Sequence, residues 1–486
     1  MPLADRPWFR LSWPFAVAAV AVGAGAVLSA ALPGYFVFLA ISAVVAAIAI
    51  LGLGIVTGSA GMIALCQLTF AAVGAWIVSL LNVMQAPGGF VLWLVLGGIA
   101  AGIVGILVGL PALRLRGVNL AVVTLGFAAA ADVTLVQIQF PGSADGTAVE
   151  RPTLFSNDRE FFFLSVVVLA VCALGVFFLQ RGRWGSSWKV VAFSERGTAA
   201  AGQSVQSAKL TAFAVSAALG GIAGGLLAGQ VQLPFASSFT PLQSLALYVL
   251  AVMSGAHLID MAILGGILWV LVPELLKRWG VPQDWAFVVF GVLGVQAITG
   301  GTNLGQGIRT LIWKRADRKT ASATLTALPA DADAGDTAIT TTTTATVDER
   351  ALDGAPVLTV EGLTVQFGAL KALDDVSFQV PAASIMGLIG PNGAGKSTFV
   401  DAISGFLPKH GGRVLLGDRD LAGLSPTRRA RLGLRRTFQQ DRVPPALTVG
   451  AYVRFVARRR LAGADIDEVL DFFGCPSAAA RRASGD

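Results

Sequence analysis

Residues 387–398 read GLIGPNGAGKST, and this stretch decides the fold of the chain around it. Gly390 and Gly395 have four residues between them, and Lys396 and Ser397 follow, which is the pattern of a phosphate-binding P-loop. The apolar run ASIMGLIG before the loop predicts a buried strand, and KSTFVDAISGF after it predicts a helix. Strand, glycine loop and helix in this order are the context that the motif requires.

Each residue type in the loop has a chemical task. The glycines let the N–H groups of residues 392–398 surround phosphate oxygens at the positive end of the following helix. We expect Lys396 to reach the β- and γ-phosphates and the Ser397 hydroxyl to ligate Mg²⁺. The predicted nucleotide-binding residues of the loop are Gly390, Asn392, Gly393, Ala394, Gly395, Lys396, Ser397 and Thr398. A P-loop alone does not distinguish kinases, GTPases and transport ATPases.

The chain before the loop is too apolar for a soluble enzyme. Of 486 residues, 55% are hydrophobic and 13% are charged, against roughly 25% charged in soluble domains. Residues 11–110 contain no Lys, Arg, Asp or Glu at all. Since about 20 apolar residues cross a bilayer as a helix, we predict a multi-span α-helical membrane domain over residues 1–310. It should have eight to ten helices, from apolar segments near 14–32, 35–56, 62–82, 90–112, 119–138, 161–180, 208–230, 242–257, 259–276 and 284–300.

The basic excess belongs to the membrane part. The net charge of the chain is +7, and residues 1–320 hold 18 Lys and Arg against 11 Asp and Glu, which is also +7. With the N-terminus in the cytoplasm, fourteen of these basic residues fall inside and four outside, as the positive-inside rule requires. The same orientation places residue 390 in the cytoplasm, where nucleotide is found. The charge therefore indicates membrane orientation and no nucleic-acid partner.

Residues 311–355 are predicted to be a linker between two domains. Ala, Thr and Asp dominate from residue 320 onward, with five consecutive threonines at 340–344, and such a stretch buries too little apolar surface to order itself. From residue 356 the pattern changes to alternation in VLTVEGLTVQFG and KALDDVSFQV, which predicts two strands. Residues 356–486 are therefore expected to form an α/β P-loop domain.

The flanks of the loop specify its class by resemblance. VQFGALKALDDVSF upstream and RRTFQQ and LTVGAYV downstream resemble an ATP-binding-cassette (ABC) domain, especially the ATP-binding subunit of branched-chain amino acid importers. The resemblance implies ATP and Mg²⁺ as cofactors, with Phe367 stacked on adenine. It implies that Gln439 contacts Mg²⁺ and the attacking water, so that Lys396 and Gln439 are the catalytic residues and Ser397 and Gln439 the metal ligands. The alternatives are purely structural roles, as a core aromatic residue for Phe367 and as an amide at a helix edge for Gln439.

The resemblance also implies what this sequence lacks. The family continues with a signature loop, a strand ending in a carboxylate that activates water, and a switch histidine, and none of these follows Gln439 here. We therefore expect an incomplete cassette, from a truncated gene product or a fragment, that offers one half-site for ATP. It should not hydrolyse ATP alone, although an ABC-type ATPase is expected in the full assembly.

Three stretches of the membrane part resemble the permease subunit of the same importers. They are GSAGMIALCQLTFAAVGAW (58–76), GLPALRLRGVNLAVVTLGF (109–127) and the region 183–226. In the third, the resemblance implies an amphipathic helix around 190–205 that docks on a cassette, with Glu195 and Gly202 where the family's coupling helix has Glu and Gly. A solvated loop is the alternative. The segment 253–266 has fewer glycines than the family pattern, which leaves the gating open.

Together these features predict a permease and ATP-binding subunit of a bacterial ABC importer for branched-chain or related hydrophobic amino acids. It would be a multi-pass protein of the plasma membrane, in contact with lipid, with its cassette in the cytoplasm. The expected partners are a second permease subunit, a complete ATPase subunit and an extracytoplasmic solute-binding protein. Three alternatives remain open: a urea or short-amide importer, a non-transporting membrane protein that senses nucleotide, and an ion-coupled carrier.

Overall fold

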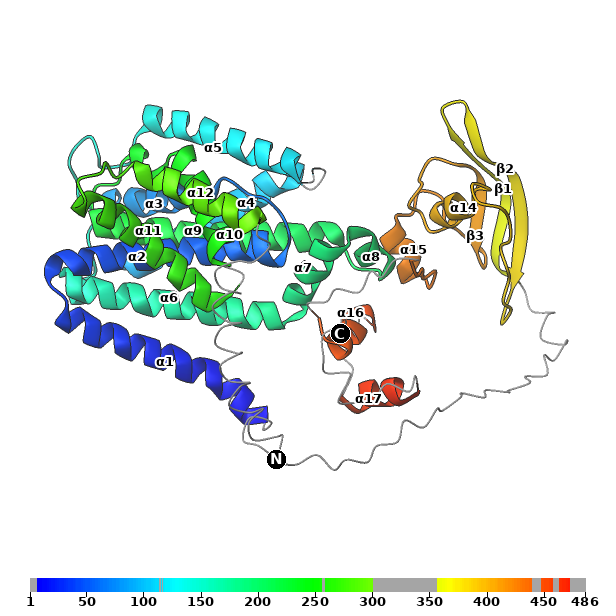
Figure 1. The fold of residues 1–486 in the computed structure, drawn as a ribbon, viewed down its shortest axis with the longest axis horizontal. Helices are drawn as coiled ribbons and strands as arrows, with labels where there is room; N and C mark the ends of the chain where they lie inside the picture. Colours follow the sequence, from blue (N-terminus) through cyan, green and yellow to red (C-terminus); the bar gives the residue numbers. More distant parts are fainter. Residues whose placement is uncertain are drawn as a thin grey trace.

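The computed structural model describes residues 7–112, 115, 117–255, 258–299, 356–438, 447–457 and 463–472. A bundle of long helices forms one part, and a small sheet with short helices forms the other (Figure 1). The predicted linker 311–355 and the predicted catalytic residue Gln439 lie outside the described residues.

Ten helices correspond to the ten predicted apolar segments. Eight described spans are long and apolar enough to cross a membrane, while α3 and α12 are shorter apolar helices. The chain is therefore a multi-pass membrane protein, as predicted. The bundle helices are α1 (Pro7–Ala31), α2 (Gly34–Leu53), α3 (Gln67–Val83), α4 (Gly89–Ala112), α5 (Val118–Ile138), α6 (Asp158–Arg181), α9 (Val205–Val231), α10 (Pro241–Ser254), α11 (Ile259–Arg278) and α12 (Trp285–Thr299).

Small residues let the central helices approach closely. A Cβ atom on Gly224 of α9 would lie 1.8 Å from the carbonyl oxygen of Ala71 in α3, and one on Gly74 would lie 2.0 Å from that of Gly221. Backbones this close exclude any larger residue, and small residues provide helix contact where lipid is as apolar as the core. Glycines of α9 therefore serve close helix packing in the bundle.

The third predicted crossing is not helical throughout. A π-helical turn, η2 (Gly54–Ser59), follows α2, and residues 60–66 are irregular before α3 begins at Gln67. Irregular backbone in a membrane domain must satisfy its polar groups within the protein. Here the N–H of Leu65 donates to Thr124 Oγ1 (3.1 Å), and the N–H of Leu68, in the first turn of α3, donates to Ser244 Oγ (3.3 Å). Hydropathy alone does not reveal such a break.

Two short helices connect α6 to α9 at the end of the bundle that faces the cassette. They are α7 (Arg183–Phe193) and α8 (Glu195–Ala200), and Figure 1 shows α8 between the bundle and the cassette. Two 3₁₀ turns, η3 (Thr153–Phe155) and η4 (Ala236–Phe239), lie in other connections.

The cassette part is built on an antiparallel sheet in the order β2-β1-β3-β4. Its core is formed by buried side chains of the sheet and of α14, including Val360, Leu363, Val414 and Phe399. The strands are β1 (Pro356–Phe367), β2 (Leu370–Pro381), β3 (Gly411–Leu416) and β4 (Arg419–Asp420), and the helices are α14 (Lys396–Ile403), α15 (Pro426–Arg431), α16 (Val449–Ala457) and α17 (Gly463–Phe472). The two strands and the helix predicted around the loop are present.

The buried strand predicted at ASIMGLIG is wrong. The structure assigns no strand to residues 383–390, and the side chains of Ile385 and Ile389 are almost fully exposed. An apolar run becomes a buried strand only where neighbouring strands pair with it on both sides. The four described strands pair with one another and not with this segment.

Candidate functional site

The glycine loop has the backbone shape of a phosphate cradle. Gly393 (φ +87°) and Gly395 (φ +84°) adopt left-handed conformations that favour glycine. A Cβ atom on Gly395 would also lie 2.5 Å from the carbonyl oxygen of Ala372 in β2. Two requirements therefore demand glycine at this position, one conformational and one steric.

Donors converge at the start of α14. The first backbone bond at its N-terminal end runs from the Phe399 N–H to the Gly395 carbonyl. The N–H groups of residues 396–398 precede it and have no acceptor within the helix, so they are available to an anion. Lys396 Nζ donates to the carbonyls of Gly390 (2.5 Å) and Pro391 (2.7 Å), which holds its ammonium group at the loop.

These residues fit a nucleoside triphosphate with Mg²⁺. The cradle offers N–H donors and one ammonium group, and Ser397 is exposed beside them. No cluster of three His, Cys, Asp or Glu side chains occurs among the described residues. Mg²⁺ in such sites takes one or two protein ligands and the phosphate oxygens, so a single Ser397 hydroxyl suffices as the ligand from this loop. Gln439, the other predicted ligand, is not among the described residues.

Phe367 lies at the same end of the hairpin as the loop. It ends β1, pairs with Leu370 at the start of β2, and leaves half of its side chain exposed. Ala372, two residues further along β2, is the residue that touches Gly395. The exposed ring is therefore placed where a base could stack on it. Phe367 is not a core aromatic residue, which was the alternative.

A buried arginine ties α14 to α15. Arg429 is only 2% exposed, and its Nη1 donates to the carbonyls of Ala402 (3.0 Å) and Ile403 (2.8 Å) at the C-terminal end of α14. Its Nε donates to the Leu424 carbonyl at 3.1 Å. A cation at a helix C-terminus is favoured by the helix dipole, whereas burial lowers the pKa of the Arg429 guanidinium. Sequence reasoning missed this residue, because nothing distinguishes it from the other arginines of TRRARLGLRR.

Asp401 connects α14 to the bundle. This residue, one and a half turns after Lys396, forms an ion pair with Arg436 and lies 3.8 Å from Nη1 of Arg196 in α8. Both guanidinium groups lie over the Phe406 ring, at 5.6 Å for Arg196 and 5.4 Å for Arg436. The helix that begins at the phosphate cradle therefore contacts the predicted coupling helix through one carboxylate.

The C-terminal end of α8 is capped by the cassette. Arg435 donates to the Ala201 carbonyl (3.2 Å), Arg431 to the Gly202 carbonyl (3.0 Å) and Thr427 to the Gln203 carbonyl (3.3 Å). Gly202 has φ +78°, the left-handed conformation that commonly ends a helix. Carbonyls left over at a helix end need donors, and three side chains of the cassette supply them.

Apolar side chains complete the contact of α7 and α8 with the cassette, which we call the α8 joint. Val190 and Ala201 are buried against Leu447 and Phe455, and Gln203 Nε2 donates to the Phe455 carbonyl at 3.0 Å. In place of the single helix predicted near 190–205, the structure has α7 and α8, which are separated at Ser194, and both contact the cassette.

Glu195 and Gly202 lie at opposite ends of this joint. Glu195, the first residue of α8, forms a 2.7 Å ion pair with Lys209 in α9. Ser194 caps α8, since its Oγ accepts from the Gly197 N–H at 3.0 Å. Glu195 therefore attaches α8 to the bundle, while Gly202 offers its carbonyl to the cassette.

The bundle also contains a small cavity. It has a volume of about 270 Å³, is partly open, lies between α2, α3, α9, η4, α10 and α11, and is mostly apolar. Its polar side chains are Ser42, Ser238 and Gln243. Such a lining suits a solute with an apolar side chain.

Membrane-spanning helices joined through a short docking helix to a P-loop domain define a membrane protein of the ABC class. Residues 35–298 match the family described as "Branched-chain amino acid transport system / permease component", and residues 373–485 match the family "ABC transporter". The first match covers more than half of the chain, so the chain belongs to this permease family. The ABC domain implies ATP binding, with Mg²⁺ as its usual companion.

Curated relatives match the two parts separately. The high-affinity branched-chain amino acid transport system permease protein LivM of Escherichia coli (strain K12) is 32% identical over 274 residues, which is 50% of this chain and 64% of LivM. The ATP-binding protein LivG of the same strain is 44% identical over 94 residues, 19% of this chain and 37% of LivG. The Fe(3+) ions import ATP-binding protein FbpC of Streptomyces coelicolor is 37% identical over 130 residues, 26% of this chain and 36% of FbpC. The chain thus spans about two thirds or less of each relative.

Proposed function

We propose that this chain is the permease and ATP-binding subunit of an ABC importer for branched-chain or related hydrophobic amino acids. The observation that carries the proposal is the α8 joint. There, three cassette side chains cap the C-terminal end of α8, and the next helix, α9, runs into the bundle. The names of the LivM and LivG relatives and the mostly apolar cavity of the bundle support the class of solute.

The mechanism starts at the loop. Lys396 exchanges the carbonyls of Gly390 and Pro391 for phosphate oxygens, and the N–H groups at the start of α14 turn to the same anion. ATP with Mg²⁺ supplies the free energy of hydrolysis. Displacement of α14 then acts on α8 through Asp401 and Arg196, and on α15 through Arg429. A two-state bundle responds only if these contacts differ between its states.

The proposal places the cassette and α8 on the cytoplasmic side of a bacterial plasma membrane. ABC ATPases sandwich ATP between two cassettes, so a complete ATPase subunit and a second permease are proposed partners. An extracytoplasmic solute-binding protein would deliver the amino acid. The cradle of residues 390–398, with Phe367 and Gln439, is the proposed nucleotide site, and Lys396 and Gln439 are the proposed catalytic residues.

Uptake into proteoliposomes tests the function. The chain, assembled with its partner subunits, should import radiolabelled leucine only with ATP in the compartment that holds the cassette. Lys396→Ala should reduce uptake to background because the ammonium group at the phosphates is lost, whereas Lys409→Ala, an exposed lysine of the same domain, should not.

Other outcomes contradict the proposal in distinct ways. Uptake that follows an ion gradient and survives Lys396→Ala would make the chain a secondary carrier. Competition by urea or acetamide, but not by isoleucine, would make it an importer of short amides. ATP binding without uptake of any of these solutes would leave nucleotide sensing as its role.

A further inference from the structure

A second cavity lies where the bundle meets α8, away from the nucleotide cradle. Its volume is about 300 Å³, at the small end of ligand-binding cavities. One wall is the irregular segment that starts the third crossing (Ala60, Gly61 and Met62), and another is the α7–α8 junction. The cavity therefore lies beside the non-helical start of the third crossing, at the end of the bundle that faces the cassette.

An ion pair dominates the polar part of this cavity. Lys209 Nζ lies 2.7 Å from Glu195 Oε1, and the two side chains are only 5% and 22% exposed. A buried charge is tolerated when a partner compensates it, and the pair as a whole is neutral. Arg196 stands at the rim and is turned to Asp401 in the cassette, 3.8 Å away.

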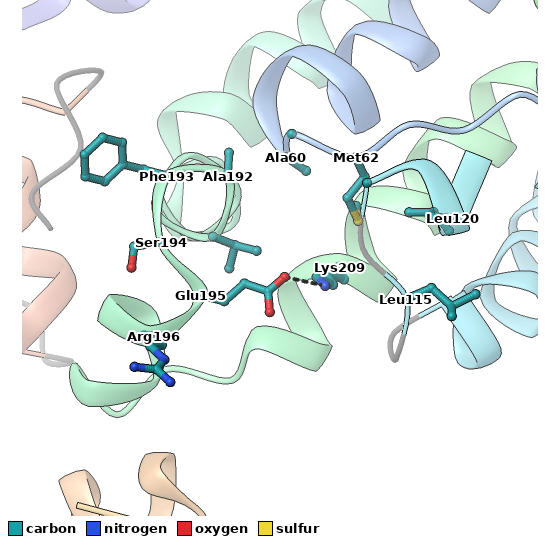
Figure 2. Close-up of a pocket in the computed structure, with 13 residues that line it drawn as sticks. Ala60, Met62, Leu115, Leu120, Ala192, Phe193, Ser194, Glu195, Arg196 and Lys209 are labelled. Atoms are coloured by element: carbon teal, nitrogen blue, oxygen red, sulfur yellow. Dashed lines mark ion pairs between the residues drawn. The ribbon is translucent and has the colours of Figure 1, made fainter. Parts of the chain in front are cut away.

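Apolar side chains form another part of the lining. Met62, Leu115 and Leu120 contribute to the wall, and Figure 2 shows them on the other side of the ion pair from Arg196. One end of the cavity thus presents both signs of charge, and the other presents aliphatic and thioether side chains.

We propose that this cavity binds a small zwitterion with an apolar side chain, with its carboxylate beside Lys209 and its ammonium group beside Glu195. A ligand with both charges adds to the neutral pair without leaving a buried charge unpaired, whereas a simple anion or cation would leave one. The inference rests on the proposed function, because an amino acid of this class is the proposed cargo. The cavity is then a site for the solute after it has crossed.

A ligand in this site contacts α8, the helix that also contacts the cassette. Glu195 begins α8, and the other end of the same helix accepts hydrogen bonds from Arg431, Arg435 and Thr427. A ligand that bridges Glu195 and Lys209 fixes α8 against α9, and binding at linked sites is reciprocal. Leucine accumulated on the cassette side should therefore slow further transport.

Equilibrium binding of radiolabelled L-leucine to the full chain in lipid nanodiscs tests the site. Unlabelled leucine should displace the label, whereas 4-methylpentanoate, which lacks the ammonium group, and 3-methylbutylamine, which lacks the carboxylate, should not. Absence of saturable binding, or equal displacement by either single-charge analogue, overturns the proposal. This readout needs no variant and so does not depend on the folding of one.

Two variants locate the bound leucine. Ala192→Phe fills the cavity from the α7 side, and Lys209→Gln removes the charge that would hold the carboxylate. Lys209→Gln should weaken leucine binding about tenfold or more, the loss expected for one charge-assisted hydrogen bond, and Ala192→Phe should weaken it at least as much because its ring occupies the space of the ligand. Lys371→Gln, which removes an exposed ion pair of the cassette, should leave it unchanged. Binding that is equal in wild type and Ala192→Phe places the leucine elsewhere and overturns the proposal.

Transport separates this inference from the function on which it rests. Leucine preloaded on the cassette side should slow uptake by the wild-type assembly and not by Ala192→Phe. If leucine is taken up and the preload slows both proteins equally, or neither, the inference fails while the proposed function stands. If the wild-type assembly takes up no leucine, the proposed function itself fails.

Discussion

Single residues carry the contacts between nucleotide cradle and bundle, and sequence patterns do not reveal them. Asp401 lies in a helix that the motif predicts, but its partners Arg196 and Arg436 are 205 and 35 residues away in the chain. Arg429 looks like any other arginine of its basic stretch until the end of α14 is seen against it. The P-loop, by contrast, could be predicted because its chemistry is contained in nine consecutive residues.

Arg429→Met should destabilise α14. The variant leaves the carbonyls of Ala402 and Ile403 without their donor, and loss of a charged hydrogen-bond partner at a buried site costs about 1.5–3 kcal/mol. Hydrogen exchange of the α14 amides in the full chain measures this free energy of opening. Arg428 is an exposed neighbour of Arg429 in α15, and Arg428→Met should change the free energy of opening of α14 by less than about 0.5 kcal/mol. Equal effects of the two variants would refute the capping role.

Among the elements, the lengths of the apolar segments predicted the helices of the bundle well. They failed where tertiary contacts decide the backbone. Residues 60–66 are not helical, and within them the N–H of Leu65 is satisfied by the hydroxyl of Thr124, which lies 59 residues further along the chain. Residues 383–390 do not form the predicted strand. This could not be foreseen, because an apolar run does not itself determine whether neighbouring strands will pair with it.

Gly224→Ala should destabilise the contact between α3 and α9. The added methyl group would lie 1.8 Å from the Ala71 carbonyl, so the helices must separate. Overpacking of this kind typically costs about 1–3 kcal/mol. Gly175→Ala in α6, where nothing lies within 4 Å of the new atom, should instead stabilise the helix by about 0.5–1 kcal/mol. Thermal unfolding in detergent should move the two midpoints in opposite directions, and a shift of both in one direction would contradict the packing.

Arg431→Ala should loosen the joint between α8 and α15. One hydrogen bond to the Gly202 carbonyl is lost, worth about 1 kcal/mol or roughly a fivefold weaker docking equilibrium. In the assembled transporter, stimulation of ATP hydrolysis by solute should fall more than the basal rate does. Arg428→Ala, on the same helix, should leave the ratio unchanged. A proportional loss of both rates in Arg431→Ala would indicate damage to the cassette and not to the joint.

At the scale of the whole molecule, the two parts meet through one short helix. The carboxylate of Asp401 approaches α8 from the phosphate-binding helix, and donors from α15 and the segment after it hold the other end. The sequence resemblance anticipated a coupling helix at this place, since Glu195 and Gly202 matched the family pattern. It did not anticipate that Glu195 faces Lys209 in the bundle while Gly202 faces the cassette.

Hydrogen–deuterium exchange of the full chain in nanodiscs, with and without saturating ATP and Mg²⁺, tests whether nucleotide binding at the loop reaches α8. We expect nucleotide to slow exchange at residues 392–399 and also to change exchange at residues 195–203. Both effects should be lost in Lys396→Ala, and only the second in Arg196→Ala. Protection of the loop with no change at residues 195–203 in the wild-type chain would contradict the account.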